Sequence, residues 1–321
     1  MRFCLGIRRA VGRASTSPVQ RLRSVWTSVL AVSGTTALAE HRTTGLSAVA
    51  ATVLLSWTPL LSLETVAEVP FKIYQHHLIV TKGSIGPLDN LSLLIDTGTT
   101  PTMVEGRIAR KLHLKAEPSM LVAFGKRATS HDTTLNGLRI GARELGPLAA
   151  GVIDLSYLEH VRIDAIVGLD VLARTSFSID YRKRVLKFSP VDREESVAPL
   201  ERTWRFLTVR MTIAGEQVRL LVDTGSSDLV LFKSRMPAAL SSAPWRGEKT
   251  VQYVSGAARL QRLDLRQVRL GTRVWDKLTA WALDRVLDGY PPGIDGVLGV
   301  LALDCQRVQF DFERNELGWS R

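Results

Sequence analysis

The chain has 321 residues, of which 45% are apolar, and a formal net charge of +11. This length and composition exclude a wholly disordered chain and accommodate one large or two small domains with an ample core. The charge is no sign of nucleic-acid binding, because residues 1–67 hold seven arginines and only two acidic residues. The other positive charges are scattered without a basic stripe, zinc-finger spacing or a helix-turn-helix pattern, so we expect no nucleic-acid partner.

Residues 1–67 have the composition of a targeting region. A basic stretch that ends at Arg23 precedes an apolar segment, residues 45–63, which is long enough to span a bilayer. We expect export to the periplasm or the extracellular space, with cleavage near Ala67 or with residues 45–63 retained as a single membrane anchor. An organellar presequence and a misassigned start are the open alternatives, since the region is rich in Arg and Ser and poor in acids.

The cysteines and histidines indicate neither a disulfide framework nor a metal site. Cys4 lies in the targeting region, and Cys305 lies in an apolar run, where we expect a small buried residue. The histidines lack the spacing of metal ligands, such as two histidines separated by three residues on one helix. We therefore expect no metal and no other cofactor.

From Phe71 onward the pattern is that of antiparallel strands. Residues 77–80 and 91–95 predict a hairpin that ends at Asp96, and residues 206–222 predict a second hairpin that ends at Asp223. Residues 104–112 are compatible with a short helix.

The chain divides into two similar halves. We predict a first lobe over residues 71–188, a linker rich in proline and charge over residues 189–203, and a second lobe over residues 204–321.

Both hairpins end in the same motif, an apolar run followed by Asp-Thr-Gly and two hydroxyl residues: residues 93–100 and 220–227. One such triplet should occur by chance roughly 0.06 times in a chain of this length. Each copy is followed by an apolar-apolar-Gly segment, at residues 165–168 and 296–299, and later by a closing pair of strands. The motif therefore marks a duplicated site.

Over residues 71–321 these motifs resemble the aspartic proteases of the pepsin/retropepsin clan, in which two lobes or subunits each contribute one Asp-Thr-Gly loop. The resemblance implies an all-β, mostly antiparallel, bilobal acid-protease-like fold built from two homologous repeats. It also implies a monomer with an internal pseudo-dimer, because both lobes lie in one chain. The expected partner is a peptide or protein substrate in the cleft between the lobes.

The chemistry of peptide hydrolysis explains why two aspartates are needed. One group must take a proton from water while another gives a proton to the carbonyl oxygen. Two carboxylates at hydrogen-bonding distance do both, because they cannot both ionise easily and so share a proton. We expect Asp96 and Asp223 to form this catalytic dyad, which titrates as one unit, so neither aspartate is assigned as the base.

Three pairs of neighbouring residues are expected to support the dyad: Thr97 and Thr224, Gly98 and Gly225, and Thr99 and Ser226. The glycines allow tight turns and close approach of the opposite loop. By resemblance, the first pair of threonines hydrogen-bonds across the interface between the loops. The third pair can donate to the carboxylates, which lowers their pKa values. We therefore hypothesise that activity is greatest below about pH 6.

Two positions are candidates for flaps that cover the cleft and bind substrate. They are Phe124 with Gly125, and Tyr253 with Gly256, each about 30 residues beyond an aspartate. Both positions are equally compatible with ordinary strands.

The sequence favours an aspartic endopeptidase that prefers apolar side chains and acidic pH. One alternative is a non-catalytic peptide-binding or envelope-associated protein that retains the fold. Another is a processing protease with one or two natural targets.

Overall fold

The computed structural model describes residues 68–321 except for 124–125, 157, 159–160, 190–191, 242–245, 254–255 and 285–289, and the described residues belong to one compact unit. The predicted targeting region, with its cleavage site and apolar segment 45–63, lies outside the described residues. No helix within the described ranges is long and apolar enough to cross a membrane.

Strands dominate both halves of the described chain. The strands of the first half are β1 (Glu68–Tyr74), β2 (Leu78–Ile85), β3 (Leu88–Ile95), β4 (Met103–Glu105), β5 (Glu117–Ala123), β6 (Lys126–Leu135), β7 (Leu138–Ile140), β8 (Arg143–Leu145), β9 (Leu148–Ile153), β10 (Ala165–Val167), β11 (Phe177–Asp180) and β12 (Val185–Phe188). Those of the second half are β13 (Ser196–Pro199), β14 (Glu201–Thr203), β15 (Phe206–Ile213), β16 (Glu216–Asp223), β17 (Leu229–Phe232), β18 (Glu248–Tyr253), β19 (Gly256–Leu270), β20 (Arg273–Leu283), β21 (Gly296–Gly299), β22 (Arg307–Asp311) and β23 (Glu316–Ser320).

The described helices are short. They are α1 (Gly106–Lys111), α2 (Leu169–Leu172), α3 (Ala238–Ser241) and the 3-10 turns η1 (Lys233–Arg235) and η2 (Val300–Leu303). Residues 104–112, expected as a helix, begin instead as strand β4, whose Met103 and Val104 pair with β10, and become helical only from Gly106.

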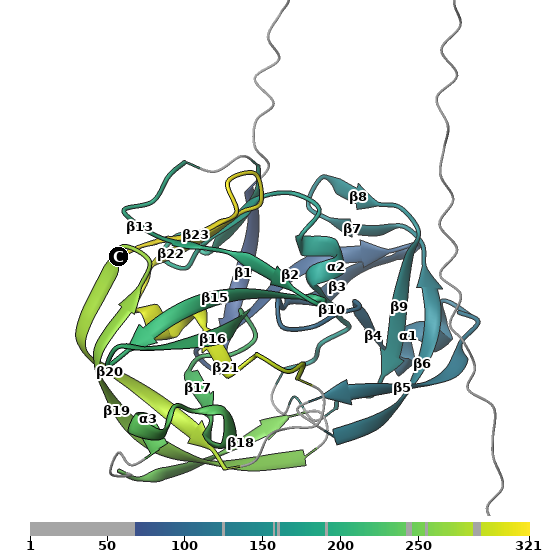
Figure 1. Cartoon of the computed structure of the whole chain (residues 1–321). Helices are drawn as coiled ribbons and strands as arrows, with labels where there is room; N and C mark the ends of the chain where they lie inside the picture. Colours follow the sequence, from purple (N-terminus) through teal and green to yellow (C-terminus); the bar gives the residue numbers. More distant parts are fainter. Residues whose placement is uncertain are drawn as a thin grey trace, which may run out of the picture. The chain divides into compact units, whose positions relative to one another are not determined.

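Figure 1 shows the strands of the first half, coloured blue to teal, on one side of this unit and most strands of the second half, green to yellow, on the other. In each half an antiparallel hairpin, β2–β3 or β15–β16, leads to an Asp-Thr-Gly motif. The hairpins differ in regularity, since the β2–β3 register shifts near Asn90, whose φ is +57°. The predicted all-β fold of two repeats is thus confirmed.

The two lobes share strands in the sheet that joins them. Strand β11 of the first lobe pairs with β22 of the second, so that Phe177 lies opposite Phe310. These two rings are fully buried and stacked, with centroids 4.6 Å apart and planes 13° from parallel. The closing strands of the two repeats therefore form one continuous hydrophobic core under both lobes.

Residues 189–203, which we predicted as a linker, contain regular structure. They contain strand β13, which pairs with β23, and strand β14, which pairs with β15. The carboxylate of Glu194 is buried, accepts a hydrogen bond from Gln309 and forms an ion pair with Arg307. An edge strand tolerates both proline and charged residues, so a segment of this composition can pair with the sheets while it joins the two lobes.

Cys305 is buried, as expected, with only 8% of its surface exposed, and its thiol contacts the carbonyl oxygen of Val300 at 3.4 Å. Burial raises the pKa of this thiol to about 12. The side chain therefore stays a neutral, small apolar group in the core.

We predict that Phe177→Ala lowers the free energy of unfolding by about 3–5 kcal/mol, because it opens a cavity in the core beneath both lobes. Urea denaturation of the full chain measures this loss. Val274→Ala is the matched control, since Val274 is 60% exposed and its truncation should change stability by less than about 0.5 kcal/mol. A similar small loss for both variants would show that the shared sheet does not stabilise the fold.

Candidate active site

Each aspartate stands at the end of a strand that is held from both sides. Strand β3 pairs in parallel with β10, and the backbone N–H of Asp96 donates to the carbonyl oxygen of Val167 at 3.1 Å. Strand β16 pairs in parallel with β21, which places Asp223 opposite Gly299. The two apolar-apolar-Gly segments identified in the sequence thus lie directly beside the two motifs.

Thr97 and Thr224 join the two loops through four hydrogen bonds. The Oγ1 hydroxyl of Thr97 donates to the carbonyl oxygen of Val222 (2.9 Å), and that of Thr224 donates to the carbonyl oxygen of Ile95 (3.1 Å). Each hydroxyl also accepts the backbone N–H of the opposite threonine, both at 3.0 Å. Both side chains are buried and fully bonded, so the loops of the two lobes are locked together as the resemblance implies.

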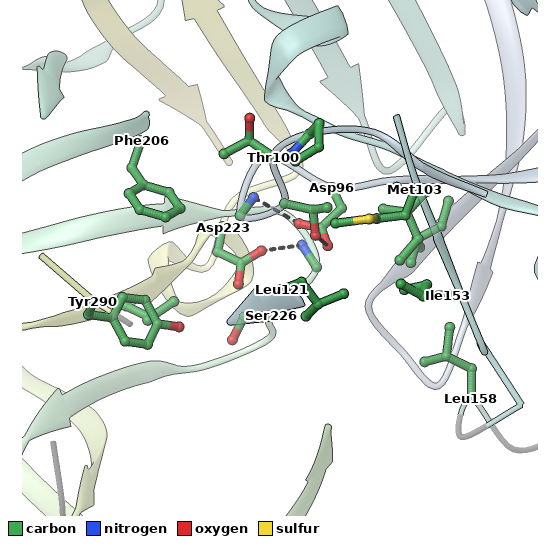
Figure 2. Close-up of a pocket in the computed structure, with 18 of the residues that line it drawn as sticks. Asp96, Thr100, Met103, Leu121, Ile153, Leu158, Phe206, Asp223, Ser226 and Tyr290 are labelled. Atoms are coloured by element: carbon green, nitrogen blue, oxygen red, sulfur yellow. Dashed lines mark hydrogen bonds between the residues drawn. The ribbon is translucent and has the colours of Figure 1, made fainter. Parts of the chain in front are cut away.

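The carboxylates are held by their own loops. Asp96 accepts the N–H of Gly98 (2.8 Å) and the hydroxyl of Thr99 (2.6 Å), whereas Asp223 accepts the N–H of Gly225 (2.7 Å). Figure 2 shows the two carboxyl groups side by side with the bonds to the glycine amides. These bonds fix the direction of both side chains toward the cleft between the lobes.

The two halves of the site are not identical. Among the hydrogen bonds of the described residues, the hydroxyl of Ser226 makes none with Asp223, although we expected it to act as Thr99 does. In the second loop it is Ser227 that donates, to Asp228 at 2.7 Å. Asp228 also receives the ammonium group of Lys249 (2.6 Å), which lies over the ring of Trp281 and connects this loop to strand β18.

Gly98 and Gly225 let the loops approach each other more closely than any other residue would. A Cβ atom at Gly98 would lie 2.6 Å from Cγ of Asp223, and one at Gly225 would lie 2.9 Å from Cγ of Asp96. Both distances are shorter than real carbon contacts. Each carboxyl group therefore packs against the glycine of the opposite loop, and this brings the two aspartates together.

The electrostatics of the pair follow from this packing. Burial and the neighbouring charge of Asp96 raise the pKa of Asp223 well above its ordinary value, while the hydrogen bond from Gly225 opposes the shift. Asp223 is 7% exposed. One carboxyl of the pair therefore retains its proton at a pH at which an isolated aspartate has lost it.

The dyad lies in a cleft of about 970 Å³ that both lobes line. Near Asp96 the cleft has aliphatic walls, and near Asp223 Figure 2 shows Phe206 and Tyr290. Burial and the charges of both aspartates raise the pKa of Tyr290, so its hydroxyl stays protonated. The sequence analysis did not identify either ring as part of the site, because neither belongs to the motif that the two lobes repeat.

Of the two predicted flap positions, only that of Tyr253 and Gly256 lies within the described residues. Phe124 and Gly125 lie outside the described residues, beyond the Ala123–Lys126 pair of β5–β6. Tyr253 and Gly256 pair at the end of β18–β19. The residues that the hairpins bring into the cleft lie further along the strands and include Leu121 and Val251.

Comparison with known families agrees with this geometry. A family model described as aspartyl protease matches residues 81–171 and 209–301, which together exceed half of the chain. Each match contains one Asp-Thr-Gly motif and one glycine-ended strand. The chain belongs to the aspartyl protease family. Comparison with curated proteins finds no match.

We predict that Thr97→Val lowers the free energy of unfolding by about 2–4 kcal/mol, because it leaves a buried N–H and a buried carbonyl oxygen without partners. Urea denaturation measures the change. The control is Thr279→Val on an exposed position of β20, which should stay within about 0.5 kcal/mol of the unsubstituted chain. Equal effects of the two substitutions would contradict a structural role for the cross-loop bonds.

Asp223→Asn tests the raised pKa through stability. The protonated carboxyl favours folding, a contribution fully present below the ordinary pKa of an aspartate and lost as the pH rises through the raised value. The neutral carboxamide does not undergo this loss. We therefore expect the Tm of the variant, relative to the unsubstituted chain, to rise between about pH 4 and pH 8. Asp89→Asn, on an exposed position, should show a constant difference. A difference independent of pH for Asp223→Asn would refute the shift.

Proposed function

We propose that this aspartyl protease family member is an aspartic endopeptidase whose Asp96 and Asp223 share one proton and act together on a water molecule. The observation that carries the proposal is the mutual packing of each carboxyl group against the opposite loop's glycine. Two carboxyl groups so close cannot both ionise easily, so a protonated and an ionised group coexist over a useful pH range.

The arrangement supports hydrolysis without a covalent intermediate. The ionised carboxylate takes a proton from water as the oxygen attacks the peptide carbonyl carbon, and the protonated carboxyl gives its proton to the carbonyl oxygen. A tetrahedral diol results. Transfer of a proton to the amide nitrogen then allows the carbon–nitrogen bond to break, which releases an amine and a carboxylic acid. The roles of the two carboxyls exchange during the cycle, so neither is assigned as the sole base.

The cleft supports a substrate of extended peptide chain with apolar side chains. Its walls are mostly apolar, and strand edges near it can pair with a peptide backbone. Both lobes belong to one chain, so we propose a monomer that needs no second copy. We also retain the proposal, which rests on residues 1–67, that the protein is exported or membrane-anchored.

We propose that activity is greatest at acidic pH, below about pH 6. The hydrogen bond that the hydroxyl of Thr99 donates to Asp96 supports this proposal. Burial and the charge of Asp96 act in the other direction, because they raise the pKa of Asp223 and so widen the pH range over which one proton is retained. A rate that still rises through pH 7 would contradict an acidic optimum.

The test is cleavage of a diverse peptide mixture by the full chain across acid to neutral pH. We predict that Asp96→Asn and Asp223→Asn each lower kcat/KM by roughly 10²–10⁴-fold, since each removes a proton-transfer group. Asp89→Asn, on an exposed position of β3, is the matched control and should retain activity.

If the carboxamide variants still bind peptides but the unsubstituted folded chain cuts none, the protein is a peptide-binding member of the family and the proposed catalysis is wrong. Cleavage that persists in either variant would equally refute a shared dyad.

A further inference from the structure

The two sides of the cleft have different chemistry. The side next to Asp96 carries Met103, Ile153 and Leu158, together with Leu78, Leu94 and Ile166, and we call it the aliphatic face. The side next to Asp223 also has aliphatic residues, such as Val230, Leu260 and Leu283, but it adds the rings of Phe206, Phe232 and Tyr290, and we call it the aromatic face. Figure 2 shows the labelled members of the two faces on opposite sides of the aspartates.

The difference arises at equivalent places in the duplicated fold. Leu78 opens strand β2, and Phe206 opens the corresponding strand β15. Leu158 lies between β9 and β10, and Tyr290 lies between the corresponding strands β20 and β21. At these two pairs of equivalent places, the first lobe has a leucine and the second lobe has an aromatic ring.

The aromatic face is held in place before any substrate arrives. The ring of Tyr290 lies 4.8 Å from that of Phe232 and 6.5 Å from that of Phe206. Arg235 donates hydrogen bonds to three backbone carbonyl oxygens, those of Tyr290 (3.2 Å), Pro291 (2.8 Å) and Ile294 (2.6 Å). Its guanidinium group also lies over the ring of Phe232, 5.9 Å from the centroid. Arg235 therefore holds the segment that presents Tyr290 through the carbonyl oxygens of its backbone.

Aromatic rings pack favourably against other rings in offset or edge-to-face geometry, beyond what burial alone provides. Unbranched and branched aliphatic side chains lack this preference. A cleft whose Phe and Tyr rings all lie on one side can therefore distinguish the two side chains that flank a bound peptide bond.

We propose that the aromatic face takes an aromatic side chain of the substrate and the aliphatic face takes an aliphatic one, so that the cleft selects peptides with different residues on the two sides of the bond that is cut. This inference rests on the proposed peptidase function and specifies its substrate. Because the chain is internally duplicated, the two lobes have similar backbones around the cleft. The two faces differ in their side chains, so a peptide should bind in one of the two possible directions along the cleft.

The experiment compares peptides that carry Phe or Leu at each of the two positions flanking one cut bond, using the full chain. We expect Phe to be favoured at one position only, with kcat/KM about three- to tenfold higher than for Leu. Tyr290→Leu and Phe206→Leu should each lower that ratio toward one and leave the ratio at the other position unchanged. Tyr290→Phe keeps the ring and should keep the selectivity, whereas a general defect in folding would lower all rates together.

Identical preferences at both positions would overturn the inference. If circular dichroism shows that the Tyr290→Leu chain is folded, a proportional fall in its kcat/KM for every peptide would also overturn the inference, because the ring would then act on the reaction rather than on a side chain.

Binding separates this inference from the proposed function. Fluorescence anisotropy gives Kd for the same labelled peptides on the Asp223→Asn chain, where catalysis is not required. A Kd ratio of threefold or more in favour of Phe at one position supports the aromatic face even if the unsubstituted chain cuts no peptide, an outcome that would refute only the peptidase function. A ratio near one at both positions refutes the inference whatever the outcome for cleavage.

Discussion

The hydrogen bonds between Thr97 and Thr224 are the constraint on which the rest of the site depends. They join the two Asp-Thr-Gly loops directly. The lobes also share a sheet, through the pairing of β11 with β22. With the loops locked, each carboxyl group lies against the glycine of the opposite loop, and the buried pair retains a proton. The closeness of the two aspartates therefore depends on hydrogen bonds between the threonine hydroxyls and the backbone of the opposite loop.

Duplication supplied a symmetric frame, and the two halves then took different roles around it. Thr99 donates to Asp96, but the second loop bonds Ser227 to Asp228, and Lys249 connects that loop to strand β18. These differences lie outside the cross-loop bonds of Thr97 and Thr224.

The repeated motif made the fold and the convergence of Asp96 and Asp223 predictable, because identical flanking patterns imply identical local structure. The aromatic face was not predictable, since Phe206 and Tyr290 are 84 residues apart in the chain and only the packing of the second lobe brings them together. The strands within residues 189–203 were missed for a related reason. They pair with β23 and β15, and this pairing depends on tertiary contacts that cannot be inferred from composition.

The most direct test of the account is a ¹³C NMR titration of the aspartate carboxyl carbons in the full chain, with Asp96→Asn and Asp223→Asn used to assign the two signals. We predict that the pair loses its protons in two coupled steps, the second well above the ordinary aspartate range, and that in Asp96→Asn the signal of Asp223 follows a single step. Two independent steps at ordinary aspartate pKa values would contradict the shared proton, and with it the proposed mechanism.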